Sequence, residues 1–287
     1  MNFISELKFK NRIISNFKTV KTWYLIPPLI LLIVFTFHFF VITERSDYVN
    51  QYISVQKDLL FYLNTSLSTY SSFQYNITQL GDALILFPLL SIFIVYAPKI
   101  LEIILTSGIF SLLASVTLKK LSAVPRPADI FENGKIVIIG KAIIHHGNST
   151  PSGHSVTIFM VTSILMFALM PKKNTPKILW FFFLILIGIG ISISRIAIGA
   201  HYPIDVASGC LIGFITAILG IKISNKFNWR NWIKSRYNMI FIVLIIIAWL
   251  VLLIQKIMLK NLPIFYISLF SLTITLFVIS KKYVQRN

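Results

Sequence analysis

The sequence predicts an all-α fold, a helical bundle that crosses a membrane several times. Of its 287 residues, 56% are hydrophobic and only 13% are charged, and the mean hydropathy is strongly positive. This composition is typical of multispanning membrane proteins. A helix that crosses the hydrocarbon core needs about 20 mostly apolar residues. The chain contains eight apolar runs near that length, at 23–42, 82–97, 100–118, 154–170, 178–194, 203–221, 238–255 and 263–280.

The first run is expected to remain as a membrane anchor. It begins late in the chain, contains Pro27 and Pro28, and is followed by no small-residue cleavage pattern of the kind that ends a signal peptide. The second run, 82–97, is short, and we expect it to be tilted or extended at one end. The remaining runs have the length of ordinary membrane-spanning helices.

The net charge of +18 predicts topology rather than nucleic-acid binding. Cytoplasmic loops of membrane proteins are enriched in Lys and Arg. When the loops between the eight runs are assigned to alternating sides, 17 of the 27 basic residues fall on the side that holds both termini. Both termini are therefore expected in the cytoplasm, and residues 1–22 are expected to form a basic cytoplasmic tail.

Five of the ten basic residues on the outer side lie in one loop, between the third and fourth runs. This loop spans residues 119–153 and is rich in Pro and Gly. The stretch KKLSAVPRP opens it, and STPSGHS closes it at the start of the fourth run. A third polar stretch, SRIAIGAHYPID, joins the fifth and sixth runs. The alternating topology brings all three stretches to the same outer interface.

The residue types in these stretches fit the binding of a phosphate group. Lys119, Arg126 and Arg195 carry the positive charge that a dianion requires, and an arginine donates two parallel hydrogen bonds to phosphate oxygens. Ser152, Gly153 and the residue after them lie where a helix begins, so their backbone N–H groups are free to bind the same oxygens.

Two histidines add a route for group transfer. Asp205 lies four residues after His201, so its carboxylate can accept a hydrogen bond from one ring nitrogen if the intervening turn is helical. The other nitrogen is then free to attack phosphorus. His154, on a separate helix, is placed to protonate the departing oxygen. This pattern predicts a two-step reaction through a phosphohistidine.

The three stretches resemble the signature of the type 2 phosphatidic acid phosphatase (PAP2) superfamily, which reads K-x6-RP, PSGH and SR-x5-H-x3-D. The chain has Lys119 with Arg126-Pro127, then residues 151–154, then Ser194-Arg195 with His201 and Asp205, and every spacing matches. The resemblance implies a six-helix core over 23–222, and it leaves 223–287 as a C-terminal extension with two transmembrane helices. It assigns phosphate binding to Lys119, Arg126, Ser152, Gly153 and Arg195, and catalysis to His154, His201 and Asp205.

The resemblance implies a bacterial inner-membrane enzyme whose active site faces the periplasm and needs neither a metal nor another cofactor. The outer loops show no metal-ligand spacing. The expected partners are the bilayer and a lipid phosphate, with undecaprenyl diphosphate or lipid A phosphates ahead of phosphatidate and phosphatidylglycerol phosphate. No nucleic acid or obligate protein partner is expected. Two alternatives stay open at this point: a lipid phosphotransferase that uses the same intermediate, and an anion transporter.

Overall fold

The structure is a computed structural model that describes residues 3–40, 48–131, 135–140, 149–226 and 236–284. Its regular elements there are helices, which confirms the predicted all-α class. The long helices are α1 (Phe3–Lys18), α2 (Ile26–Phe40), α3 (Tyr48–Ser68), α7 (Pro98–Ser122), α9 (Gly153–Ala168), α10 (Asn174–Ala197), α11 (Pro203–Lys226), α13 (Arg236–Lys260) and α14 (Pro263–Val284). The short ones are η1 (Thr22–Leu25), α4 (Ser71–Thr78), η2 (Gln79–Gly81), α5 (Ala83–Leu89), α6 (Phe93–Tyr96) and α8 (Pro127–Ile130).

Within the described residues, five helical segments are long and apolar enough to cross a membrane: Pro98–Ile130, Asn174–Ala197, Pro203–Lys226, Val243–Lys260 and Pro263–Lys281. The first expected span is α2, and it forms a sixth crossing if it is counted together with α1, from which it is bent by 69°. The expected span at 154–170 is α9, which is shorter, with 16 residues.

The apolar run at 82–97 is not one continuous helix. It forms α5 and α6, with turns between them. Pro88 lies in the last turn of α5 and cannot donate a backbone hydrogen bond there. Ala97 leaves the helical region because it precedes Pro98, and it separates α6 from α7. The run is thus a bent element, a departure from the single tilted helix that we expected.

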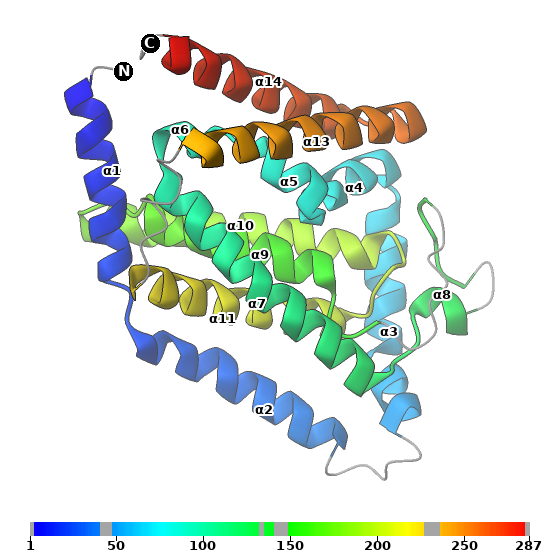
Figure 1. Ribbon diagram of the computed structural model, residues 1–287. Coiled ribbons are helices and arrows are strands. Elements are labelled where there is room, and N and C mark those ends of the chain that lie inside the picture. Colours follow the sequence, from blue (N-terminus) through cyan, green and yellow to red (C-terminus); the bar gives the residue numbers. More distant parts are fainter. Residues whose placement is uncertain (1–2, 41–47, 132–134, 141–148, 227–235, 285–287) are drawn as a thin grey trace.

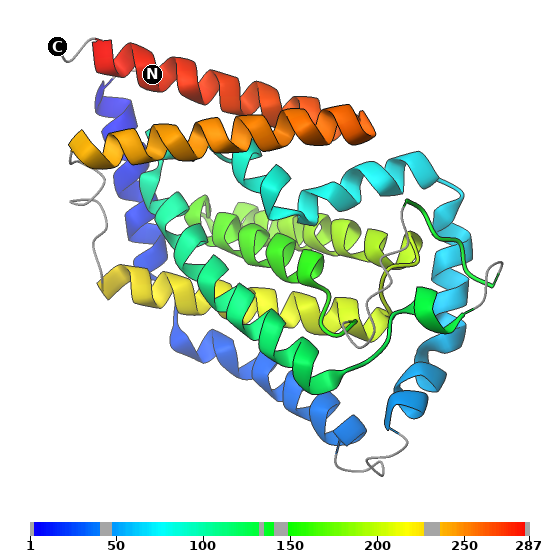
Figure 2. The same cartoon turned by 45° about the vertical axis from the view of Figure 1, so that its right-hand side comes forward.

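Helices α7, α9, α10, α11, α13 and α14 run in roughly the same direction and form a bundle, and α1 and α3 run across its two ends (Figures 1 and 2). Both termini lie near one end of this bundle. The end of α7, the start of α9, the end of α10 and the start of α11 lie at the opposite end, where α3 and α8 also lie. The three polar stretches of the sequence therefore meet at one end of the bundle.

The close packing of α9 on α11 positions the site. A Cβ atom at Gly213 would lie 2.5 Å from the backbone oxygen of Val156, and one at Gly209 would lie 2.8 Å from that of Ser152. Real Cβ atoms do not approach other heavy atoms so closely, so these glycines let the two helix backbones approach, as small residues do in membrane helix pairs. The beginning of α9 is thereby held beside the first turns of α11.

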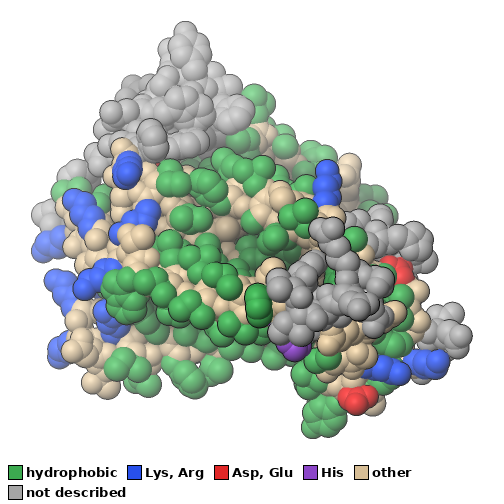
Figure 3. All heavy atoms as spheres, turned by 90° about the horizontal axis from the view of Figure 1, so that it is seen from below, with side chains coloured by type: hydrophobic (Ala, Val, Ile, Leu, Met, Phe, Trp, Pro, Cys, Tyr) green, Lys and Arg blue, Asp and Glu red, His purple; other side chains and the backbone are tan. Residues whose placement is uncertain are grey.

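The expected basic tail contains a docked helix. Ile13 and Phe17 of α1 are buried in the main hydrophobic core. The side-chain amide of Asn16 donates to the backbone oxygens of Ala168 and Met170 at 2.9 and 3.1 Å, at the end of α9. Basic side chains gather at the left of the face in Figure 3, the side on which α1 lies in Figure 1.

Candidate active site

The corner between α10 and α11 brings Arg195 and His201 to the same region. After α10 ends, Gly199 adopts a left-handed conformation (φ +72°) that favours glycine. The amide of Gly199 donates to the oxygen of Ile196 at 2.9 Å, and the amide of Ala200 donates to that of Arg195 at 3.0 Å. The helix therefore stops sharply, and His201 lies directly before α11.

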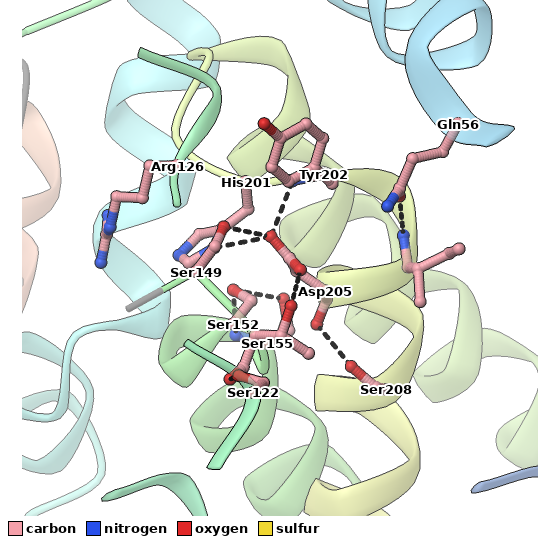
Figure 4. Close-up of polar contacts among 12 residues, drawn as sticks. Gln56, Ser122, Arg126, Ser149, Ser152, Ser155, His201, Tyr202, Asp205 and Ser208 are labelled. Carbon is pink, nitrogen blue, oxygen red and sulfur yellow. Dashed lines mark hydrogen bonds and ion pairs between the residues drawn. The ribbon is translucent and has the colours of Figure 1, made fainter. Parts of the chain in front are cut away.

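His201 and Asp205 form the expected pair. The Nδ1 atom of His201 lies 3.3 Å from the Oδ2 atom of Asp205, and both residues are buried, with 1% and 0% of their surface exposed. The backbone amide of Tyr202 and the hydroxyl of Ser149 also donate to Oδ2, at 2.9 and 2.5 Å (Figure 4). The carboxylate is thus fixed by several donors and holds the imidazole of His201 from one side.

The charge state of His201 follows from its surroundings. Burial lowers the pKa of His201 well below its usual value, and the charges of Arg126 and Arg195 act in the same direction. The hydrogen bond to Asp205 opposes this shift but does not reverse it. The ring is therefore neutral near pH 7, and a neutral ring is the form that can act as a nucleophile.

The start of α9 supplies backbone donors and the second histidine. Ser152 is the N-cap: its side-chain oxygen accepts from the amide of Ser155, and its own amide donates to the backbone oxygen of Asp205 at 2.9 Å. A Cβ atom at Gly153 would meet no other atom within 4 Å, so there is open space beside this residue. His154 is partly exposed and packs against Gly81, where an added Cβ would lie 2.6 Å from the Cβ of His154.

Three cations surround this end of the bundle. Arg126 and Arg195 are 8% and 5% exposed, and among the described residues neither Nε atom has a hydrogen-bond partner. One terminal nitrogen of Arg195 donates to the hydroxyl of Thr78 at 3.0 Å. Lys119 lies in the last turn of α7 and is half-buried, whereas its neighbour Lys120 is exposed. Buried donors are normally paired, so the two free Nε groups indicate a site that takes up an acceptor such as an anion.

Two backbone contacts join the first polar stretch to the second. The hydroxyl of Ser122 donates to the oxygen of Thr150 at 2.9 Å, and the amide of Ser149 donates to that of Val124 at 2.9 Å. These bonds place the loop that carries Arg126 beside the residues that precede α9. The structure therefore brings all eight predicted site residues to one end of the bundle.

Sequence analysis missed the contribution of α3. The hydroxyl of Tyr52 donates to Oδ1 of Asp205 at 2.6 Å, and Gln56 accepts the amide of Ile204 at 2.9 Å at the start of α11. Asn64 donates to the backbone oxygens of Ile196 and Ala197 at 3.1 and 3.0 Å. With Leu60, these residues recur every four positions and are buried. This spacing marks one face of a helix, and it was the signal that could have revealed them.

Thr150 is a second contributor that the motif does not include. Its hydroxyl donates to Oδ1 of Asp205 and lies 2.9 Å from the hydroxyl oxygen of Tyr52, which donates to the same carboxylate oxygen. Burial and the charge of Asp205 raise the pKa of Tyr52, so this phenol keeps its proton. Within the part of the chain that the structure describes, no group of three or more His, Cys, Asp or Glu side chains could hold a metal ion.

Together, these features define an all-α membrane protein with a cationic, histidine-containing site at the ends of four helices. Residues 99–229 match the model of the PAP2 superfamily. The resemblance seen in the three motifs is thereby confirmed.

Two known proteins are similar to parts of this chain. Over 101 residues the chain is 32% identical to the bacitracin transport permease protein BcrC of Bacillus licheniformis, a match that covers 35% of this chain and 46% of that protein. The match thus spans less than half the length of this relative. The crystal structure of Aquifex aeolicus LpxE superposes with a TM-score of 0.50 at 24% identity, over 58% of this chain and 95% of that chain. This second likeness is one of fold.

Proposed function

We propose that this protein is a membrane phosphatase that hydrolyses the phosphomonoester or diphosphate headgroup of a lipid. The observation that carries the proposal is the buried His201–Asp205 pair beside two buried arginines whose Nε donors have no partner in the described chain. The match of residues 99–229 to the PAP2 superfamily model supports it. Lys119, Arg126 and Arg195 bind the phosphate oxygens, together with the backbone amide of Gly153. The amide of Ser152, which we expected to be free, donates to the backbone oxygen of Asp205, so Ser152 contributes as the N-cap of α9.

In the first step, Nε2 of His201 attacks phosphorus while Asp205 holds Nδ1. A P–N bond forms as the P–O bond to the lipid breaks, and the electron pair of that bond leaves with the lipid oxygen. His154 donates a proton to this oxygen, so that the product is a neutral alcohol, or a lipid monophosphate when the substrate is a diphosphate. The arginines stabilise the charge that develops on the three equatorial oxygens.

In the second step, water attacks the phosphohistidine. His154 is now neutral and accepts the proton from water as the new P–O bond forms. The P–N bond breaks, its electron pair returns to His201, and inorganic phosphate is released. No cofactor takes part in these steps, because the basic side chains supply the positive charge.

The proposed location is a bacterial inner membrane, with both termini in the cytoplasm and the site at the periplasmic surface. The 17 to 10 division of basic residues supports this orientation. We assign the catalytic core to 23–222 and the extension to 223–287. A reporter that is active only in the cytoplasm, fused to the C-terminus, tests the orientation. A silent reporter on a well-expressed fusion contradicts it.

At headgroup level, a site can be reached by lipids that diffuse laterally in the bilayer. The candidate substrates are envelope lipids, namely undecaprenyl diphosphate and lipid A phosphates, followed by phosphatidate and phosphatidylglycerol phosphate. A lipid phosphotransferase would use the same phosphohistidine, with a lipid acceptor in place of water. Transport is the alternative from a different class, and we include it in the test because the Bacillus relative is a transport permease protein by name.

The test is phosphate release by the purified protein in detergent with a chelator present. Each lipid phosphate is assayed separately, with His201→Ala as the blank. Release of inorganic phosphate from one or more lipids, lost in the variant, is expected. Transfer of label to a second lipid without phosphate release identifies a transferase. Absence of both reactions, combined with uptake of the lipid or anion into proteoliposomes, identifies a transporter.

A further inference from the structure

The C-terminal helices α13 and α14 lie outside the residues that match the PAP2 superfamily, yet they contact the site through α5. Ile246, Leu253, Phe265 and Leu272 form a buried cluster with Ile85 of α5. The hydroxyls of Ser268 and Ser271 donate to the backbone oxygens of Ile85 and Leu89 at 3.1 and 2.7 Å. The hairpin of α13 and α14 therefore packs on α5 through both apolar contacts and hydrogen bonds.

The docked hairpin places a cation beside the site. Lys256, in the last two turns of α13, forms an ion pair with Asp82, the N-cap of α5. Both side chains are about three-quarters buried, with 26% and 23% exposed. The ammonium group of Lys256 also lies over the ring of Phe265, 6.0 Å from its centre. The pair is thus held between two packed elements and is not a loose surface contact.

Asp82 belongs to the short segment 78–82 that covers two residues of the site. Thr78 accepts the hydrogen bond from Arg195, and Gly81 packs directly against His154. The charge of Asp82 acts on Arg195, and that of Lys256 acts on His154. A carboxylate this close to a phosphate site repels the substrate unless a cation neutralises it.

We propose that Lys256 neutralises Asp82 and thereby sets the affinity of the site for phosphate, which makes it a positioning residue supplied by the C-terminal extension. The proposal rests on the proposed function and names a further determinant of the same site. It also gives the extension a role: without the hairpin, Asp82 would be an uncompensated negative charge next to Arg195 and His154.

The test is a double-mutant cycle read out by binding of inorganic phosphate, measured by calorimetry on the full chain in detergent. Lys256→Met removes the cation but keeps the apolar stem, and it should weaken phosphate binding by roughly five- to tenfold. Asp82→Asn keeps an N-cap acceptor for Leu84 and leaves Lys256 unopposed, so binding should be unchanged or tighter. The double variant should bind within about twofold of the wild type, because both charges are gone.

A matched control comes from the same hairpin. Lys260 lies over the ring of Tyr75, 5.2 Å from its centre, and is exposed. Lys260→Met should leave phosphate affinity unchanged. If Lys256→Met does not fold, Lys256→Gln is used in its place. The effect of Asp82→Asn on phosphate binding is measured independently of either lysine variant.

A pair with only a structural role gives a different pattern, since both single variants and the double variant would then bind phosphate more weakly. That pattern overturns the proposal, as does unchanged affinity in Lys256→Met or a wild type that does not bind phosphate. A wild-type protein that binds phosphate but releases none from any lipid contradicts the proposed function. In that case the double-mutant cycle still tests whether Lys256 neutralises Asp82. The proposal is supported if Lys256→Met weakens phosphate binding, Asp82→Asn leaves it unchanged or tightens it, and the double variant binds like the wild type.

Discussion

The hydroxyl of Tyr52 donates a 2.6 Å hydrogen bond to Oδ1 of Asp205, so α3 contacts the carboxylate that orients the proposed nucleophile. Tyr52 lies 153 residues before Asp205 in the chain and belongs to none of the three motifs. Its pKa is raised, so it remains a donor over the whole physiological pH range. The site is therefore supported from outside the segment that matches the PAP2 superfamily.

Tyr52→Phe removes this donor and keeps the ring. Asp205 retains its bonds from Ser149, Thr150 and the amide of Tyr202, so we expect a partial loss of about 1 kcal/mol, or about fivefold in kcat/KM. The measurement is steady-state hydrolysis of an aryl phosphate. Tyr62→Phe, on the exposed side of the same helix, is the control and should match the wild type. Equal rates in both variants would show that Tyr52 serves packing alone.

Lys119 and Lys120 are adjacent and have opposite surroundings, which makes them a matched pair. Lys119→Gln removes a half-buried cation from the site, and kcat/KM should fall about 100-fold, as when one preorganised donor is lost. Lys120→Gln alters an exposed residue and should change kcat/KM by no more than about twofold. The measurement is kcat/KM of both variants and the wild type on the same lipid phosphate. Similar losses in both variants would mean that Lys119 does not bind phosphate.

Arg195→Lys separates charge from geometry. Lysine keeps the positive charge but cannot donate two parallel hydrogen bonds, and it loses the bond to Thr78 in its present form. Transition-state stabilisation should fall by about 2–4 kcal/mol while the protein still folds. We would measure kcat/KM and the midpoint of thermal unfolding of both proteins in the same detergent, so that a loss of activity is distinguished from a loss of stability. A lysine variant with near-normal turnover would reduce Arg195 to a membrane-end anchor.

The lowered pKa of His201 predicts an unusual titration. A free imidazole gains its proton as the pH falls below about 6.5, but burial keeps His201 neutral well below that pH. Its ¹³Cε1 resonance, assigned by its loss in His201→Gln, should therefore not titrate between pH 8 and pH 5. The acid limb of the rate profile would then report another group. A midpoint for His201 near pH 6.5 is the contrary outcome.

The motif residues could be predicted because their roles depend on short-range spacing. Helical geometry places His201 and Asp205 one turn apart, and alternating apolar runs carry the other two stretches to the same end of the bundle. The run at 82–97 was harder, since hydropathy does not register Pro88, which lies in the last turn of α5, or Pro98, before which α6 ends. The contributions of α3 and α13 depend on tertiary contacts between residues far apart in the chain. The four-residue spacing in α3 indicates that one face of this helix is buried, but it does not identify Asp205 as the partner.

The proposed reaction requires a covalent phosphohistidine at His201. His154→Ala allows that intermediate to form from an aryl phosphate, whose leaving group departs without a proton, but it slows the attack by water. Rapid quenching of this variant with ³²P-labelled aryl phosphate should trap acid-labile, base-stable label on the peptide that contains His201, with none in the His154→Ala/His201→Ala double variant. Phosphate release by the single variant without any label on that peptide would contradict the mechanism.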